Sequence, residues 1–150
     1  MYDDASAPSD RTRILSNHTC PESRAMHRSR LSTLLIDAPA DQAAASAAFW
    51  SAALGGPTQS TDEEPQFSTL QERVPDLVIA VQAVQDTARY HLDIETDDVA
   101  AEVHRLTALG AVEVSSWQGC HTLEVPGGHL LCVIPLHSDP ATFARLAQTW

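Results

Sequence analysis

The chain has 150 residues, of which 43% are hydrophobic, and a chain of this size and composition forms one globular domain with its own core. Nine basic against 20 acidic residues give a net charge of −11, which argues against partners such as nucleic acid and anionic membranes, because both attract basic surfaces. The three cysteines form no C-x-x-C pair, no apolar run approaches the roughly 18 residues of a membrane span, and the N-terminus is polar. We therefore expect a cytoplasmic protein.

Residues 1–30 follow neither a helical nor a strand period and hold few large apolar side chains, so they are expected to form a disordered leader. Beyond this leader, apolar runs bounded by Pro and Gly predict the elements of the first half. These are a strand at 31–37, a helix from Asp41 to Leu54, and strands at 66–72 and 76–83.

The segment 90–95 alternates strictly between apolar and polar residues, which is typical of a half-buried strand. One face carries Tyr90, Leu92 and Ile94, and the other carries His91, Asp93 and Glu95. The elements expected after it are a helix from Asp97 to Gly110 capped by Thr96, strands at 111–116, 121–125 and 129–135, and a helical C-terminal tail over 137–150.

The order strand, helix and three strands therefore occurs twice, over about 31–86 and about 88–136. Ala53-Leu54-Gly55 of the first half returns as Ala108-Leu109-Gly110 in the second. Two such units indicate a paired, pseudo-symmetric domain, because one half could not bury its sheet alone.

Four segments in this order resemble the vicinal oxygen chelate superfamily, and within it the glyoxalase-like and bleomycin-resistance-like proteins. They are Ala48-Phe-Trp-Ser-Ala-Ala-Leu-Gly55, His91-Leu-Asp-Ile-Glu-Thr-Asp-Asp98, Leu106-Thr-Ala-Leu-Gly-Ala111 and Pro126-Gly-Gly-His-Leu-Leu-Cys-Val133. The resemblance implies an α+β fold in which two βαβββ modules pair into a cupped, barrel-like mixed sheet around a ligand cavity.

Metal-dependent members of that superfamily take one ligand from the first and last strand of each module. Carried onto this sequence, the four positions are Ser32, Ala80, His91 and Cys132. A divalent ion needs several imidazole, carboxylate or thiolate donors, and this set offers only His91 and Cys132, so it lacks at least one strong ligand. A register error of one residue would bring other polar groups into play, among them Gln82, Asp93, Glu124 and His129, without restoring four ligands. We therefore expect neither an intact metal site nor a cofactor.

His91 is the strongest catalytic candidate, because an imidazole on the polar face of a strand suits a general base or a substrate contact. Asp93 follows at a strand distance of about 6.6 Å, from which it could orient His91 or bind the substrate itself. The structural alternative is a histidine whose hydrogen bonds are satisfied by a neighbouring strand.

Six further residues are candidates for ligand binding: Ser32, Gln82, Trp117, His121, Glu124 and Cys132. Trp117 could stack on a flat ligand at the rim of the cup, or simply cover the edge of the sheet. Cys132 is typical of a small buried side chain, although a Cys–His pair with His91 is the catalytic alternative.

The functional expectation is a protein that binds a small organic molecule in the cup. If it is an enzyme, we expect a proton-transfer lyase or isomerase with His91 as base, assisted by Asp93 or Glu124. Two alternatives stay open, a metal-dependent lyase or dioxygenase and a non-catalytic dimerising module. The open sheet leads us to expect a homodimer.

Overall fold

The computed structural model describes residues 26–150, and residues 1–25 of the predicted leader lie outside this range. Strand β1 (Arg28–Pro39) begins before the boundary predicted at residue 30. Ser29 and Arg30 already pair with β5 (Arg89–Thr96) and are buried. These two residues are ordered because they pair with a strand that is distant in sequence, and such pairing cannot be read from the local apolar pattern.

Module one contains β1, helix α1 (Ala43–Leu54) and strands β2 (Thr58–Gln59), β3 (Phe67–Val74) and β4 (Leu77–Val84). The helix begins after Gln42 rather than at Asp41, and its cap has no side-chain hydrogen bond. It ends at Gly55, whose φ of 71° is left-handed and suits glycine, and the Gly55 N–H bonds the carbonyl of Ser51. The two-residue strand β2 is not predicted from the apolar pattern.

Module two repeats this order with β5, helix α2 (Val99–Ala108) and strands β6 (Val112–Trp117), β7 (Cys120–Glu124) and β8 (Leu130–Pro135). The cap of α2 is Asp98, which accepts a hydrogen bond from the Ala101 N–H. The prediction of Thr96 as the cap is wrong. Its hydroxyl donates instead to the carbonyl of Arg28 and so ties β5 to β1.

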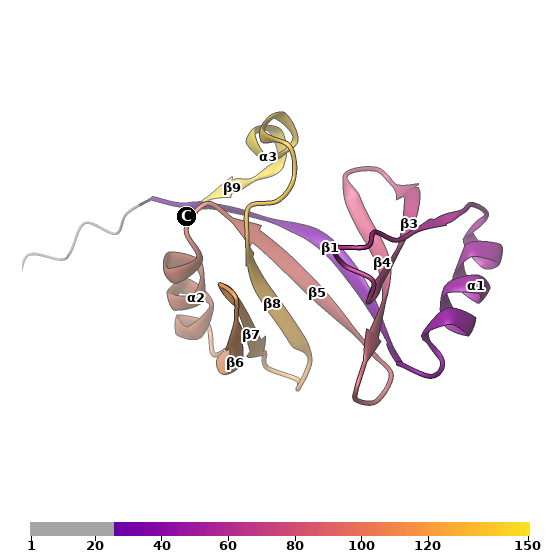
Figure 1. Ribbon diagram of the computed structural model, residues 1–150. Coiled ribbons are helices and arrows are strands. Elements are labelled where there is room, and N and C mark those ends of the chain that lie inside the picture. The colour runs from indigo at the N-terminus through magenta and orange to yellow at the C-terminus, as the bar shows by residue number, and fades with distance from the viewer. Residues whose placement is uncertain (1–25) are drawn as a thin grey trace, which may run out of the picture.

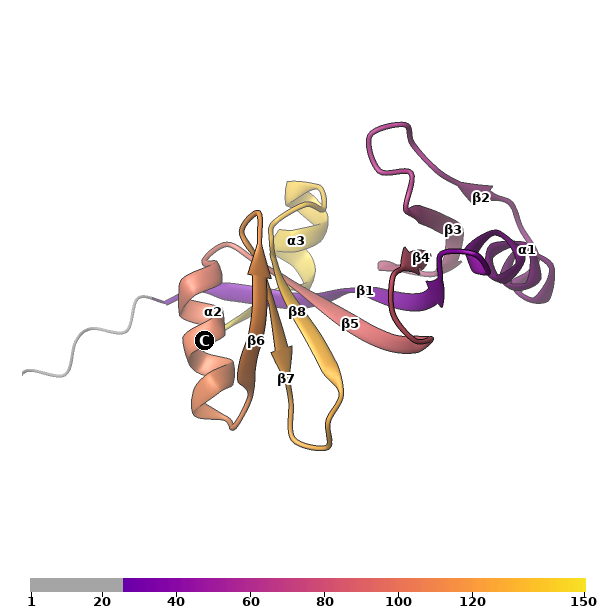
Figure 2. The same cartoon turned by 60° about the horizontal axis from the view of Figure 1, so that its bottom comes forward.

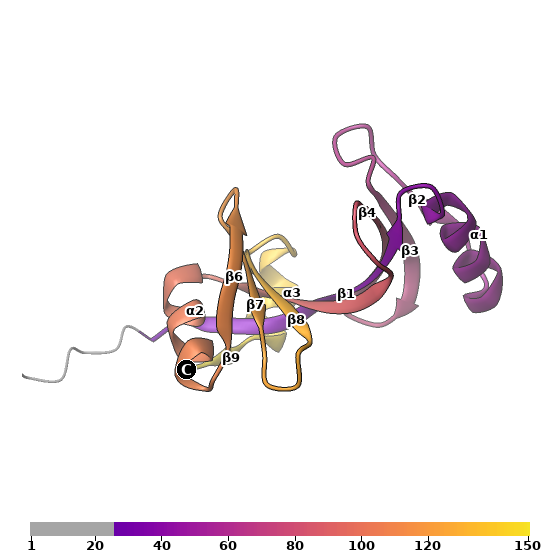
Figure 3. The ribbon, with the colours of Figure 1, turned by 90° about the horizontal axis from the view of Figure 1, so that it is seen from below.

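The strands form one mixed sheet in the order β2-β3-β4-β1-β5-β8-β7-β6, with the short β9 (Gln148–Thr149) beside the start of β1 (Figure 1). Within each module the first and last strands are parallel, and the antiparallel β1–β5 pair joins the modules. The predicted α+β fold of two βαβββ modules is confirmed. Viewed from below, the two ends of the sheet rise on the same side (Figure 3). Among the described strands, β2 and β6 are unpaired edges, so the sheet is an open cup rather than a closed barrel.

Each module has its own apolar cluster under its helix, and α1 and α2 lie at opposite ends of the molecule (Figure 2). The first cluster centres on Ile36, Leu70 and Val81, and the second on Leu106, Leu123 and Val133. The middle of the outer face is uncovered. The apolar face predicted for β5 is therefore only partly buried, since Tyr90 and Leu92 are exposed.

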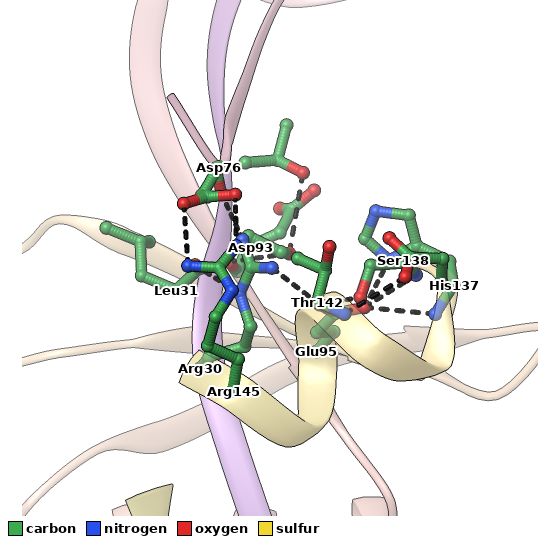
Figure 4. Close-up of polar contacts among 12 residues, drawn as sticks. Arg30, Leu31, Asp76, Asp93, Glu95, His137, Ser138, Thr142 and Arg145 are labelled. Carbon is green, nitrogen blue, oxygen red and sulfur yellow. Dashed lines mark hydrogen bonds and ion pairs between the residues drawn. The ribbon is translucent and has the colours of Figure 1, made fainter. Parts of the chain in front are cut away.

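The C-terminal segment, which contains α3 (Pro140–Leu146) and β9, is fastened to the sheet at Glu95 (Figure 4). This fully buried carboxylate accepts hydrogen bonds from the backbone N–H groups of His137 and Ser138 and from the Ser138 hydroxyl. Arg30 lies 3.5 Å away. Burial alone would raise the pKa of Glu95, but these hydrogen bonds lower it below its ordinary value.

The rest of the segment is held by an ion pair and by the terminal residue. Arg145 of α3 pairs with Asp76 at 2.8 Å (Figure 4). The Trp150 indole N–H donates to the Ser29 hydroxyl at 2.8 Å, and the guanidinium of Arg105 stacks 3.8 Å from the Trp150 ring. The predicted helical tail is thus one short helix followed by a strand. No helix in residues 26–150 has the length and apolar character required to traverse a bilayer.

Candidate functional site

The concave side of the sheet holds a cavity of about 820 Å³ between the two modules. Alternate residues of the two central strands form its floor: Thr33, Leu35 and Asp37 of β1, and His91 and Asp93 of β5. They share one face because the side-chain period of a strand is two. Residues of β3, β4, β7 and β8 complete the wall.

Five of the residues predicted from sequence line this cavity: His91, Asp93, Gln82, Trp117 and Cys132. Cys132 of β8 lies opposite Asp93 in the parallel ladder, so the two side chains share a face. Trp117 stands at the end of β6 and is 72% exposed, which places it at the rim.

Three other predicted residues do not line it. Ser32 falls at an irregularity in the β1–β5 register, and its hydroxyl donates to the backbone carbonyl of Asp93. His121 does not face the cavity. Its Nδ1 lies 2.8 Å from a carboxylate oxygen of Glu113. Glu124 is exposed beyond the cavity wall. Ser32 instead lines a smaller neighbouring groove of about 290 Å³.

The floor is organised around a chain of three titratable groups. His91 Nδ1 lies 2.9 Å from Oδ2 of Asp37, and His91 Nε2 lies 3.5 Å from Oδ1 of Asp93. Arg89 Nε donates to the same Asp37 oxygen at 3.1 Å. Because an ionised carboxylate can only accept, Asp37 holds the proton of His91 on Nδ1 and leaves Nε2 directed at Asp93.

Among the carboxyl groups of residues 26–150 with a shifted pKa, Asp93 is the one whose pKa is raised. Burial raises its pKa to about 6, the neighbouring His91 pulls it down, and the negative charge of Asp37 raises it further. A carboxyl group that titrates near neutral pH beside an imidazole can exchange one proton with it. Such a pair is suited to general acid–base chemistry.

Asp37 and Arg89 are the residues that sequence reasoning missed. Asp37 is fully buried, and Arg89 also pairs with Asp86 at 2.8 Å, so the guanidinium is shared by two carboxylates. One indication was present in the sequence, since Asp37 is an acid at the end of the apolar run Leu34-Leu-Ile-Asp-Ala38. A buried acid implies a partner, but the partner lies more than 50 residues away along the chain.

The two described cysteines lie in the cavity wall as thiols. Burial and the charge of Asp93 raise the pKa of Cys132 to about 12 and also raise the pKa of Cys120. A thiolate is the reactive form of cysteine, so neither group is activated for nucleophilic attack. The catalytic Cys–His pair considered for Cys132 and His91 has no support in this geometry.

The four positions that the superfamily uses for a metal do not fit one in this chain. Ala80 has no donor atom, Ser32 lies outside the cavity, and the Cys132 thiolate is costly to form. His91 directs both ring nitrogens at carboxylates. Within residues 26–150 no group of three or more His, Cys, Asp or Glu side chains is arranged to hold an ion.

Comparisons with known proteins agree with this architecture. The family model described as "Glyoxalase-like domain" matches residues 33–134. The solved structure of hypothetical protein BH1468 from Bacillus halodurans C-125 has a TM-score of 0.51 at 9% identity, covering 74% of this chain and 96% of that one. The 2,2',3-trihydroxybiphenyl 1,2-dioxygenase of Sphingomonas wittichii strain RW1 also has a TM-score of 0.51, at 13% identity over 78% of this chain and 45% of that one.

Methylmalonyl-CoA epimerase from Mycobacterium tuberculosis matches with a TM-score of 0.49 at 14% identity, covering 74% of this chain and 90% of that one. No curated protein matches the sequence. At such identities the structural likenesses concern the fold alone. The family match spans most of both modules, and the paired βαβββ topology agrees with it. The chain therefore belongs to the glyoxalase-like domain family.

Proposed function

We propose that the protein binds a small organic molecule in the central cavity and transfers a proton on it, as a lyase or isomerase that uses His91 and Asp93. The observation that supports this most is the chain from Asp37 through His91 to Asp93 on the floor of a cavity of about 820 Å³. That volume suits a ligand of metabolite or drug size.

In this proposal Asp93 touches the substrate and His91 exchanges the proton with it. One proton is shared by the pair, residing either on the Asp93 carboxyl or on His91 Nε2. When the pair carries no proton, the Asp93 carboxylate accepts one from a substrate carbon or oxygen and can pass it to His91 Nε2, and the reverse steps return it to the substrate. A pKa of about 6 keeps both forms of Asp93 accessible near neutral pH.

Asp37 and Arg89 are positioning residues. Asp37 fixes the tautomer of His91 and stabilises the imidazolium that forms during transfer, as a buried carboxylate behind a catalytic histidine does. Arg89 balances the charge of Asp37 from the other side. The apolar lining, which includes Leu35 and Leu130, keeps the surroundings of the pair at low dielectric and strengthens these interactions.

The test is exchange of carbon-bound hydrogen with solvent deuterium, because this assay can be run without knowing the natural substrate. Dihydroxyacetone, acetoin and aminoacetone are incubated with the protein in D2O, and deuterium next to the carbonyl is followed by NMR. We expect exchange with at least one compound. We expect it to fall about 100-fold or more in Asp93→Asn and in His91→Gln, which is the usual scale of general acid–base catalysis.

The matched control is Asp62→Asn, which makes the same chemical change in an exposed loop acid. Circular dichroism confirms that each variant is folded. Exchange at equal rates in the wild-type protein and all three variants would contradict the proposal.

A further inference from the structure

The central cavity has an excess of negative charge. Its described lining contains three carboxylates, from Asp37, Glu64 and Asp93. Among residues 26–150 the lining includes one permanent cation, Arg89, and that guanidinium already contacts Asp37 at 3.1 Å and Asp86 at 2.8 Å. An anionic ligand would therefore meet no free positive charge, while a cationic ligand would meet uncompensated carboxylates.

Two buried carboxylate oxygens in the floor also have no hydrogen-bond partner among the described residues. They are Oδ1 of Asp37 and Oδ1 of Asp93. The Asp93 side chain is 11% exposed, its Oδ1 atom is buried, and this oxygen has only the ion-pair contact with His91 at 3.5 Å. Leaving a buried acceptor without a donor costs free energy, so a ligand that brings N–H donors to Asp93 gains more than one that brings acceptors.

Aromatic and apolar side chains supply the rest of a cation-binding environment. Phe67 and Trp117 line the same cavity, and the face of an aromatic ring attracts a cation. Leu35, Val78 and Ile134 offer apolar contacts to the uncharged part of a ligand. Trp117 is largely exposed at the rim, where its ring can contact such a ligand.

We propose that the cavity selects organic ammonium ions, with the ammonium N–H groups at the Asp93 carboxylate and the apolar part of the ligand against the Phe67 side of the wall. This inference rests on the proposed function in using the same cavity and names its substrate class. It does not depend on catalysis, because it concerns binding alone.

Binding of a cation has a further consequence for the proton shared by His91 and Asp93. A positive charge beside Asp93 stabilises its carboxylate and repels an imidazolium at His91. The complex therefore holds fewer protons than the free protein, and binding releases protons near pH 6. Neutral and anionic ligands of the same shape lack this effect.

The experiment uses three probes that share a phenyl ring with a two-carbon side chain and differ in charge: 2-phenylethylamine, 2-phenylethanol and phenylacetate. Binding to the full-length protein is measured by the shift in melting temperature and by calorimetry at pH 6 in two buffers of different ionisation enthalpy. The proteins are wild type, Asp93→Asn and the matched control Asp62→Asn.

We expect the amine to raise the melting temperature most, the alcohol less, and phenylacetate not at all. Amine affinity should fall about 10- to 100-fold in Asp93→Asn, the loss typical of one charge-assisted hydrogen bond, and should be unchanged in Asp62→Asn. Calorimetry should show proton release on amine binding to wild type only. Phenylacetate binding as tightly as the amine, no binding by the amine, or equal amine affinity in wild type and Asp93→Asn, would overturn the inference.

The outcome also separates this inference from the proposed function. Amine binding that depends on Asp93, without deuterium exchange into any ketone, supports the ammonium site and contradicts proton transfer. Exchange into neutral ketones, together with an amine that does not bind, supports proton transfer and contradicts the ammonium site.

Discussion

Replacing Asp93 by Asn should stabilise the protein at neutral pH, because ionised Asp93 is held in a site that disfavours its charge. Its pKa is about 6 in the fold against an ordinary value of 3.8, a difference of about 2 units. At 1.36 kcal/mol per unit this corresponds to about 3 kcal/mol of lost stability when the group is ionised. Asn has nearly the same shape and cannot ionise.

The sign of the pH dependence follows from proton binding. Between about pH 4 and pH 6 the folded protein holds a proton on Asp93 that the unfolded chain has already lost, so wild-type stability falls as pH rises through this window. Below about pH 4 both states are protonated, and above about pH 6 the full loss is present. Asp93→Asn should therefore match wild type near pH 4 and exceed it by up to about 3 kcal/mol at pH 7.

The assay is urea unfolding at half-unit steps from pH 4 to pH 7.5, with free energies compared between wild type, Asp93→Asn and Asp62→Asn. The exposed control should show no such trend. A variant less stable than wild type at pH 7, or a difference that is the same at pH 4 and pH 7, would refute the reasoning. Stabilisation together with lost exchange activity would be the trade-off expected of a functional site.

Other measurements test separate parts of the structure. Cys132, with a pKa of about 12, should react with iodoacetamide at pH 8 at least 100-fold more slowly than free cysteine, followed by peptide mass spectrometry, and equal rates would show that the thiol is not buried as described. Glu95→Gln should cost about 3–5 kcal/mol in urea unfolding by breaking a buried charged network, whereas an unchanged midpoint would mean the C-terminal segment is held elsewhere. Elemental mass spectrometry of the wild-type protein should find no metal in stoichiometric amount. A stoichiometric metal that is lost in His91→Ala would contradict the account of the site. Light scattering should give a homodimer that Leu92→Arg, on the exposed outer face, converts to a monomer, and a monomeric wild type would contradict this.

The elements that depend on local pattern could be predicted from the sequence. The strict alternation over 90–95 correctly assigned His91 and Asp93 to one face, because the strand period is a property of neighbouring residues. The duplicated order of elements likewise predicted two modules. The position carried over from the resemblance failed at Ser32, because the register of β1 with β5 shifts between Leu31 and Thr33.

The parts that depend on distant contacts could not be predicted. His121 belongs to a strand whose facing depends on its pairing with β6 and β8, and the structure directs it to Glu113 instead of the cavity. Asp37 of β1 is brought to His91 and Arg89 of β5 by the antiparallel pairing of the two modules. The sequence shows that Asp37 is an acid within an apolar run, but it does not show which residues become its partners.

The most direct test of the account is the protonation state of His91, observed by two-bond nitrogen–proton NMR of the imidazole between pH 5 and pH 8. The account predicts that Nδ1 stays protonated throughout, because it donates to Asp37, and that the Nε2 signal responds near pH 6, where the Asp93 carboxyl beside it gains or loses its proton. In Asp93→Asn this response at Nε2 should be lost while the proton on Nδ1 remains. A neutral His91 with its proton on Nε2, or an Nε2 signal that depends on pH identically in wild type and Asp93→Asn, would contradict the shared-proton chain.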